Sequence, residues 1–239
     1  MKVTTELGVK FVGDYSAVLN AMMKTVNELL MEESVDNTEE LLKGILALLS
    51  ERCYVDRSIK LMHEVYRLDY DTFVHSLNVA MISHELATWL GWNEEDVEKV
   101  TLCGLLHDVG KLRVEYAILM KPGRLTEEER LNMQEHPILG FELLEKCQTV
   151  DEHVRNAAMQ HHERYDGSGY PCGLEGKQID KFARVVAIAD VYDAMTANRV
   201  YRDAMEPGYV LDQMRAECER YDTEFFAVFH DKVKELLAC

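Results

Sequence analysis

The apolar residues of this chain recur at three- and four-residue spacing along most of its length. Near the N-terminus the pattern is set by Leu19, Met22, Val26 and Leu29. Such spacing gathers apolar side chains on one face of a helix, whereas a half-buried strand alternates them. We find no convincing alternating segment and no internal repeat. The pattern therefore predicts an all-α protein.

The charge balance limits the partners that the chain can bind. A Lys+Arg total of 26 against 43 Asp+Glu gives a formal net charge of −17. This excess of acid argues against binding to a nucleic acid polymer, which needs a basic surface. A small phosphorylated ligand stays compatible, because metal ions and a few Lys or Arg side chains can reverse the field within one cleft.

Cysteine usage and hydropathy bear on the compartment. The six cysteines are scattered without a C-x-x-C pair: Cys53, Cys103, Cys147, Cys172, Cys218 and Cys239. A chain of 239 residues with 47% hydrophobic content can bury a core without disulfides, so we interpret them as reduced thiols. No segment approaches the roughly 20 apolar residues of a membrane span. We expect a cytoplasmic protein with no membrane span.

Capping residues and glycines mark the expected helices. They cover about residues 15–32, 37–49, 55–68, 71–90, 93–109, 126–136, 151–162 and 180–197. Residues 1–60 carry no recognisable chemistry and are predicted to be an N-terminal helical extension of unknown role. This extension could pack on the core, form the seam of a homodimer or be the remnant of a sensory region.

Several histidines and aspartates fall on inner helix faces or at helix ends. His75 shares an apolar stripe, and Asp71 lies one turn earlier on the same face. His107 and Asp108 close one predicted helix, and His136 stands where one helix ends and Pro137 opens the next. Each position also has an ordinary structural explanation, such as a hydrogen-bonded core histidine or a polar helix end.

Two later positions strengthen the pattern. His161 and His162 end the predicted helix 151–162, and a glycine-rich loop follows them. Asp190 lies on a helix face otherwise made of small apolar residues. A carboxylate buried there must be paired or bound to a cation, because burying it alone is costly.

Together these residues form a larger ligand set than one ion needs. The set is His75, His107, Asp108, His136, His161, His162 and Asp190, with Asp71 in reserve. Nitrogen and oxygen ligands without a thiolate suit two, or with Asp71 three, closely spaced Fe, Mn or similar transition-metal ions. We choose Asp108 as the carboxylate that bridges them. Such ions can acidify a bound water and clamp a phosphoryl group, the usual arrangement for phosphoester hydrolysis.

The order of these motifs resembles a known family. H…HDVGK…H…HHERYDGSGYP…D, followed by ADVYDAMTANRVYR at residues 189–202, is similar to the HD-GYP domain, a subgroup of the HD metal-dependent phosphohydrolases. The resemblance covers about residues 61–239 and implies an HD-type helical bundle. It also implies a phosphodiesterase that opens cyclic di-GMP to pGpG, and could continue to GMP, by in-line attack of a metal-bridging hydroxide.

The resemblance assigns roles by position. The histidines and aspartates above match the family's metal ligands, and Asp108 is also placed in catalysis. Lys111 matches the lysine beside the HD pair and would hold a phosphate or neutralise charge developing on it. Gly169 and Tyr170 belong to the GYP signature beside the ligand, and Arg199 and Arg202 match basic positions that face the substrate.

Several alternatives stay open at this point. Some family members carry a glutamate for a third metal where this chain has Asp71, so the sequence leaves two or three metals open. The chain could hydrolyse another cyclic dinucleotide or nucleotide, or it could be a cyclic di-GMP receptor without turnover. The usual receiver domain is not recognisable in about 60 N-terminal residues, so the chain could be a fragment of a longer protein.

Overall fold

The structure is a computed structural model that describes residues 17, 72–119, 121–146, 150–197 and 204–238. The predicted helices over 15–32, 37–49 and 55–68 lie outside the described residues, apart from residue 17. Asp71, Arg199 and Arg202 also lie outside them.

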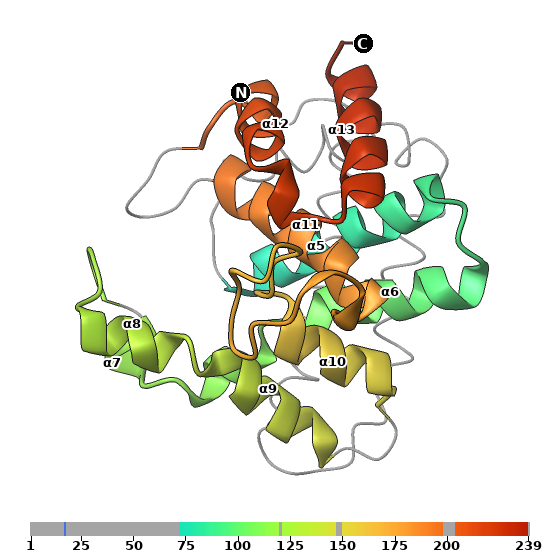
Figure 1. Cartoon of the computed structure of the whole chain (residues 1–239). Helices are drawn as coiled ribbons and strands as arrows, with labels where there is room; N and C mark the ends of the chain where they lie inside the picture. Colours follow the sequence, from blue (N-terminus) through green and yellow to red (C-terminus); the bar gives the residue numbers. More distant parts are fainter. Residues whose placement is uncertain (1–16, 18–71, 120, 147–149, 198–203, 239) are drawn as a thin grey trace.

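The described residues form α-helices and short 3-10 helices, with no strand among them, which confirms the all-α prediction. The elements are α5 (Thr72–Trp89), α6 (Glu94–Leu106), η1 (Val109–Arg113), α7 (Tyr116–Leu119), α8 (Glu127–Met133), α9 (His136–Glu145), α10 (Glu152–Gln160), η2 (Gly176–Gln178), α11 (Lys181–Thr196), α12 (Pro207–Ala216), η3 (Cys218–Arg220) and α13 (Thr223–Ala238). Figure 1 shows α5, α6, α10 and α11 in the middle of the molecule, α12 and α13 at one end, and α7 and α8 projecting from the body.

The core is centred on α5, which packs along α6 and α11. Leu77, Ala80 and Met81 of α5 are fully buried. Gly104 of α6 allows a close helix contact, because a Cβ at this position would lie 2.8 Å from the Cα of Ala80. The two helices therefore touch through their backbones, a spacing that a larger side chain at residue 104 would prevent.

Aromatic rings join the turn after α5 to α11 and α13. The ring of Trp92 meets that of Phe182 at a centroid distance of 5.3 Å and that of Phe225 at 5.8 Å, both edge to face. Edge-to-face pairs of this kind add stability beyond the area that they bury. They hold α11, which carries Asp190, against the α5–α6 pair.

Several predicted helix boundaries are confirmed. Asn93 caps α6 by accepting a hydrogen bond from the amide of Asp96, and Gly91 has a positive φ of 72° at the preceding turn. Thr126 and Glu129 form both hydrogen bonds of the expected capping box at the start of α8. The boundaries follow from local hydrogen bonding, which is why short sequence patterns predict them.

Two predicted boundaries are wrong by a few residues. The helix expected to reach residue 109 ends at Leu106, and the chain turns at His107 before entering η1. The helix expected to finish at His136 ends at Met133, and His136 opens α9 instead. The Nδ1 of His136 lies 2.7 Å from the carbonyl oxygen of Met133, so this ring satisfies an acceptor that the end of α8 leaves free.

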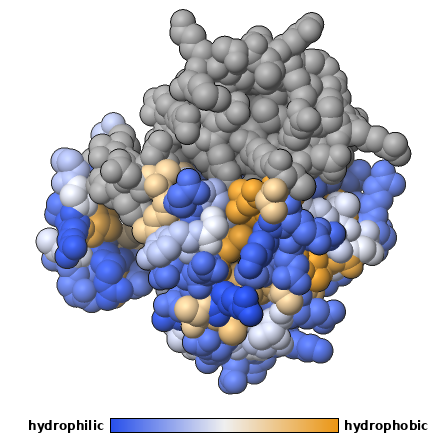
Figure 2. All heavy atoms as spheres, turned by 90° about the horizontal axis from the view of Figure 1, so that it is seen from above, coloured by the Kyte–Doolittle hydropathy of each residue, from blue (hydrophilic) through white to orange (hydrophobic). Residues whose placement is uncertain are grey.

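In the view of Figure 2, the surface of the described residues is mostly hydrophilic, with smaller apolar areas between polar residues. Among the described residues, the large hydrophobic side chains that are exposed are Tyr116, Leu131, Ile138 and Tyr209. None of the helices described has the length and apolar character needed to cross a membrane.

The contact at Gly104 generates a stability prediction. Gly104→Ala should lower the free energy of unfolding by about 1–3 kcal/mol, because its methyl group would strike the backbone of α5. Gly208→Ala is the matched control in α12, where nothing lies within 4 Å of the added Cβ, and it should be neutral or stabilise by up to about 1 kcal/mol. Urea unfolding of metal-free protein measures both, and equal midpoints for the two variants would contradict the close contact.

Candidate metal centre

The predicted ligands among the described residues converge at one place in the core. His75 lies in the first turn of α5, His107 and Asp108 follow α6, and His136 opens α9. His161 and His162 follow α10, and Asp190 lies in α11. All of them are buried except His162, which is partly exposed. The helices thus bring these side chains together mainly at helix ends.

Asp108 stands between two pairs of imidazoles. Its Oδ1 lies 3.3 Å from Nε2 of His136 and 3.7 Å from Nε2 of His161. Its Oδ2 lies 3.6 Å from Nε2 of His75 and 3.4 Å from Nε2 of His107. Each oxygen therefore faces a different pair of nitrogens, which is the arrangement of a carboxylate that bridges two cations.

Asp190 also reaches toward both sides. Its Oδ1 lies 3.1 Å from Nε2 of His75 and 4.0 Å from Nε2 of His107. Its Oδ2 lies 3.9 Å from Nδ1 of His162. The potential ligand atoms form two groups that share Asp108. Within each group, all of the atoms lie within 4.8 Å of one another. One consists of Asp108, His136, His161 and His162, and the other of His75, His107 and Asp108.

The hydrogen bonds of the rings test whether a cation fits. Burial and the neighbouring His162 and His107 hold the pKa of His161 well below its usual range, so the His161 ring is neutral. Its Nδ1 donates to the carbonyl of Ala158 at 3.0 Å, which leaves a lone pair on Nε2. That Nε2 lies only 3.2 Å from Nε2 of His136. A lone pair directed at another ring nitrogen is what a shared cation would satisfy.

Two buried polar atoms of the centre also indicate a bound cation. Nε2 of His107 and Oδ1 of Asp108 are buried and have no hydrogen-bond partner. Native proteins rarely leave buried polar atoms unsatisfied, because each costs the desolvation of that group. Both atoms lie in the centre of the ligand groups, so the residues present fit a metal centre.

The protonation states suit metal binding. Burial lowers the pKa of His162 to about 3, although Asp190 opposes this change, so the ring is neutral near pH 7. Burial alone would raise the pKa of Asp108, but the charge of Lys111 and the neighbouring His107 outweigh it and hold the pKa well below its usual range. The half of the centre around His161 and His162 thus combines neutral imidazole with ionised carboxylate, the forms that bind cations. At His75, burial alone would lower the pKa, but the hydrogen bonds to Asp190 and Asp193 outweigh it and raise the pKa to about 9, so a cation would displace a proton from this ring.

Gly110 explains why the HD pair can approach α9. A Cβ at this residue would lie 1.9 Å from the carbonyl oxygen of His136 and 2.4 Å from the amide nitrogen of Gly140. Only glycine permits this backbone contact. Lys111 follows directly, and its Nζ forms an ion pair with Asp108 Oδ2. The H-D-V-G-K motif therefore places a carboxylate and a cation beside His136.

Comparison with known proteins decides the family. A family model described as the HD domain matches residues 40–225. The chain belongs to the HD domain family. Phosphohydrolases of this family bind divalent metal ions, in agreement with the ligand groups found here. The match begins inside the predicted extension 1–60, and the division into 1–60 and 61–239 stays a prediction.

The relatives of this HD domain protein include cyclic dinucleotide phosphodiesterases. The 3′3′-cGAMP-specific phosphodiesterase 1 of Vibrio cholerae is 45% identical over 161 residues, which are 66% of this chain and 37% of that protein. The cyclic di-GMP phosphodiesterase response regulator RpfG of Xanthomonas campestris is 47% identical over 120 residues, 50% of this chain and 32% of that protein. The chain spans well under half the length of either relative. With the intact motifs, these relatives confirm the HD-GYP resemblance.

A solved structure shares the fold. An HDG"Y"P protein from Bdellovibrio bacteriovorus superimposes with a TM-score of 0.79 and covers 98% of this chain and 74% of that one. Its sequence identity to this chain is 18%, so the likeness concerns the fold alone. It confirms the predicted HD-type helical arrangement.

The GYP loop of this HD domain covers one edge of the metal centre. The ring of Tyr170 stacks on that of His162, with a centroid distance of 4.7 Å and an interplanar angle of 25°. Gly169 makes this fold of the loop possible, because a Cβ there would lie 2.3 Å from the amide nitrogen of Arg164. The structure thus places Tyr170 directly against one potential ligand, while a contact of Gly169 and Tyr170 with substrate stays a prediction.

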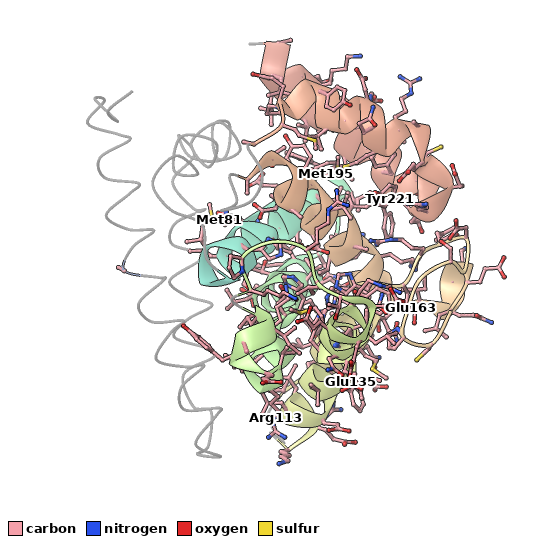
Figure 3. All side chains as sticks on the ribbon, turned by 90° about the vertical axis from the view of Figure 1, so that its left-hand side faces the viewer. Met81, Arg113, Glu135, Glu163, Met195 and Tyr221 are labelled. Atoms are coloured by element: carbon pink, nitrogen blue, oxygen red, sulfur yellow. The ribbon has the colours of Figure 1, made fainter. Side chains whose placement is uncertain are left out.

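Glu163 was not singled out from the sequence. Its carboxylate is buried and accepts hydrogen bonds from the amides of Cys172 at 2.7 Å and Leu174 at 3.0 Å. Glu163 lies where the loop after α10 leaves the helical core (Figure 3). Its carboxylate therefore connects the residues that follow Gly169-Tyr170-Pro171 to the chain directly after His162. Its place directly after the histidine pair is the only sequence signal that could have indicated it.

Asp193 is the second residue that the sequence analysis missed. It is 0% exposed, and its Oδ2 lies 2.6 Å from Nδ1 of His75. It follows Asp190 by three residues, so both carboxylates share one side of α11. Asp193, like Asp190, is a carboxylate on the inner face of α11 and therefore needs a partner.

Two cations near the GYP loop were also not expected. Burial raises the pKa of the Tyr170 hydroxyl, and the charges of Arg164 and Arg130 oppose this rise. Both guanidinium charges thus act on this hydroxyl, and Arg130 also pairs with Glu127 of α8. Arg130 is on α8 and Arg164 is in the loop, so the two come from different parts of the chain.

The two hydrogen bonds of the Glu163 carboxylate should slow the opening of the loop after α10. Glu163→Ala removes a charged acceptor from two amides, so Cys172 and Leu174 should exchange their amide hydrogens at least about tenfold faster. Hydrogen exchange followed by NMR or mass spectrometry measures this change. Glu145→Ala, an exposed site on α9, is the control and should leave both rates unchanged. Unaltered protection in Glu163→Ala would mean that other contacts hold the loop.

Proposed function

We propose that this chain is a metal-dependent phosphodiesterase that hydrolyses cyclic di-GMP to pGpG and can continue to GMP. The observation that carries the proposal is Asp108, whose two oxygens face separate pairs of buried imidazoles. A pair of ions bridged by a carboxylate is the usual equipment for phosphoester hydrolysis. The relative RpfG, named a cyclic di-GMP phosphodiesterase, supports the substrate.

The metals that we propose are two transition-metal ions, Fe or Mn. One would be held by His75, His107 and Asp108, and the other by Asp108, His136, His161 and His162, with Asp190 beside both. Nitrogen and oxygen ligands of this kind suit these ions, and the groups contain no thiolate. When bound, such ions acidify water and neutralise negative charge on the phosphoryl oxygens. A third ion would use Asp71, which lies outside the described residues.

The substrate would approach from the side of Lys111 and His162. The side chain of Lys111 is 24% exposed and that of His162 20%, whereas those of His107 and His161 are 0% exposed. Lys111 would therefore contact a phosphate that enters and would neutralise the charge that develops on it. Tyr170, stacked on His162, would bound the cleft on the same side.

The reaction itself adds one water across a phosphodiester. The P–O3′ bond breaks, the oxygen of water stays on phosphorus, and the leaving 3′ oxygen takes a proton from solvent or a nearby group. In cyclic di-GMP the first cut gives the linear pGpG, and a second gives GMP. The buried carboxylates fix the positions of the ligand rings. These groups therefore need little rearrangement when negative charge develops on the phosphate in the transition state.

A second substrate is favoured by a specific observation. The Vibrio cholerae relative at 45% identity is named as specific for 3′3′-cGAMP. We therefore propose that cyclic dinucleotide is the substrate class and that the base identity is decided at the rim of the cleft. Arg199 and Arg202 stay predictions there, and Arg130 and Arg164, whose charges act on Tyr170, would be additional cations for the phosphates or guanine edges. A receptor without turnover is disfavoured, because the ligand set is complete.

We also propose that the protein acts in the cytoplasm. Among the described residues, Cys103, Cys172 and Cys218 are free thiols, which are typical of reducing compartments. A homodimer through residues 1–60 stays a prediction.

The first test is anaerobic turnover of cyclic di-GMP by protein loaded with Fe(II) or Mn(II). Asp108→Ala should lose activity by at least about a hundredfold, because it removes the oxygens that both ligand groups share. Glu142→Ala, an exposed acid on α9, is the control and should retain activity. Chromatography separates pGpG from GMP. Turnover of 3′3′-cGAMP alone would transfer the proposal to that substrate, and no turnover of either by the metal-loaded protein would overturn it.

The second test separates the lysine from the metals. Lys111→Met should lower kcat by about a hundredfold, since one charge that stabilises the developing negative charge is lost. The metal content should stay at the wild-type value, because the ligand atoms remain. Lys121→Met is the matched control, since Lys121 pairs with Glu129 on α8 instead of with Asp108. Kinetics together with metal analysis measure both variants, and an unchanged kcat would remove Lys111 from the mechanism.

A further inference from the structure

Four histidines of the centre, His75, His107, His136 and His161, differ in the acceptor that their Nδ1 atom faces. The Nδ1 atoms of His107, His136 and His161 each lie within hydrogen-bond distance of a backbone carbonyl. These acceptors are Gly104 at 2.7 Å, Met133 at 2.7 Å and Ala158 at 3.0 Å. The Nδ1 of His75 instead faces the carboxylate of Asp193 at 2.6 Å. Among these rings, His75 is the one oriented by a full negative charge.

The helix α11 holds the His75 ring from two directions. Asp193 accepts a hydrogen bond from Nδ1, and Asp190, one turn earlier, places Oδ1 3.1 Å from Nε2. Both contacts are buried, so water does not weaken them. The ring therefore has a fixed orientation, with Nδ1 toward Asp193 and Nε2 toward the metal centre.

A carboxylate partner also changes the ring as a ligand. It draws the Nδ1 proton toward itself, which raises the electron density at Nε2 and makes that nitrogen a stronger donor than one backed by a carbonyl. Partners of this kind typically alter metal affinity by about 10–100-fold when they are removed. The ligand strength of His75 thus depends on a residue that does not itself face the metal.

The two ligand groups consequently carry unequal charge. The group of His75 and His107 has one oxygen of Asp108, Asp190 at 3.1 Å and the buried carboxylate of Asp193 behind it. The group of His136, His161 and His162 has the other oxygen of Asp108, while Asp190 stays 3.9 Å from His162. The Lys111 ammonium pairs with Asp108 Oδ2 on the side of the first group and offsets one of these charges, but the closer Asp190 and the Asp193 carboxylate still leave that group the more negative. A divalent cation is therefore attracted more strongly to the first group.

We infer that Asp193 is a positioning residue that orients His75 and makes the His75 half of the metal centre the tighter half, which fills first. This inference rests on the metal centre of the proposed function. It concerns the order of metal binding and does not depend on which cyclic dinucleotide is cleaved.

The test is a titration of Mn(II) into metal-free protein, with free Mn(II) counted by electron paramagnetic resonance. Wild type should bind in two steps of different affinity. Asp193→Asn keeps the size of the side chain and an acceptor oxygen but removes the charge, and it should weaken the tighter step by about 10–100-fold while leaving the weaker step. His136→Gln, in the other half, should weaken the weaker step instead.

Asp222→Asn is the matched control. Asp222 is a buried carboxylate that pairs with Arg184, away from the ligand groups, and the same change there should leave both steps unaltered. Circular dichroism of the metal-free variants checks that they fold. Should Asp193→Asn lose its helical signal, Asp193→Glu retains the charge but displaces the oxygen, and it should weaken the same step.

The outcomes separate this inference from the proposed function. Two equal steps in wild type, or an Asp193→Asn variant that weakens only the second step or neither, would overturn the role of Asp193 and leave the metal centre standing. Absence of any Mn(II) or Fe(II) binding by wild type would overturn the metal centre itself. Selective loss of the tighter step supports the inference whether or not the variant turns over substrate.

Discussion

Asp108 places a negative charge in the core, and the surrounding helices are arranged to surround it with partners. A buried carboxylate alone would cost several kcal/mol, but here Lys111 pairs with one oxygen, and the other faces imidazoles that could share a bound cation with it. Helix ends, more than helix middles, meet at this point. The carbonyls of Gly104, Met133 and Ala158 lie at or near helix C-termini, where they are free to accept the Nδ1 protons of the histidines. The unsatisfied groups of the helix ends thus become the supports of the site.

Local features of this fold were predictable because their causes are local. The capping box of Thr126 and Glu129 and the cap at Asn93 depend on residues three apart, so short patterns in the sequence reveal them. The helical spacing that buries His75 acts over a few turns. That the ligands meet was inferred from their chemistry as a set, since no single histidine indicated a metal.

Other features depend on residues far apart in the sequence and could not be predicted from it. Asp193 is 118 residues from the histidine that it contacts, and although its place one turn after Asp190 predicts a buried carboxylate, nothing in its neighbours shows which ring it meets. The early end of α6 has a similar cause. Gly110 must touch the carbonyl of His136, and only the packed structure shows that the chain leaves the helix to make this contact. Helix ends are therefore decided by tertiary contacts as well as by caps.

The backbone contact at Gly110 has a further consequence. The chain leaves the metal centre at Lys111 and returns to it at His136, and between these residues α7 and α8 project from the body (Figure 1). Because Gly110 already touches His136, the two ends of this excursion are joined independently of its length. The entropy of closing a loop grows only slowly with added residues. The outer part of the projection is thus a suitable place to insert a reporter peptide or a fluorescent domain while the distances among the imidazoles are preserved.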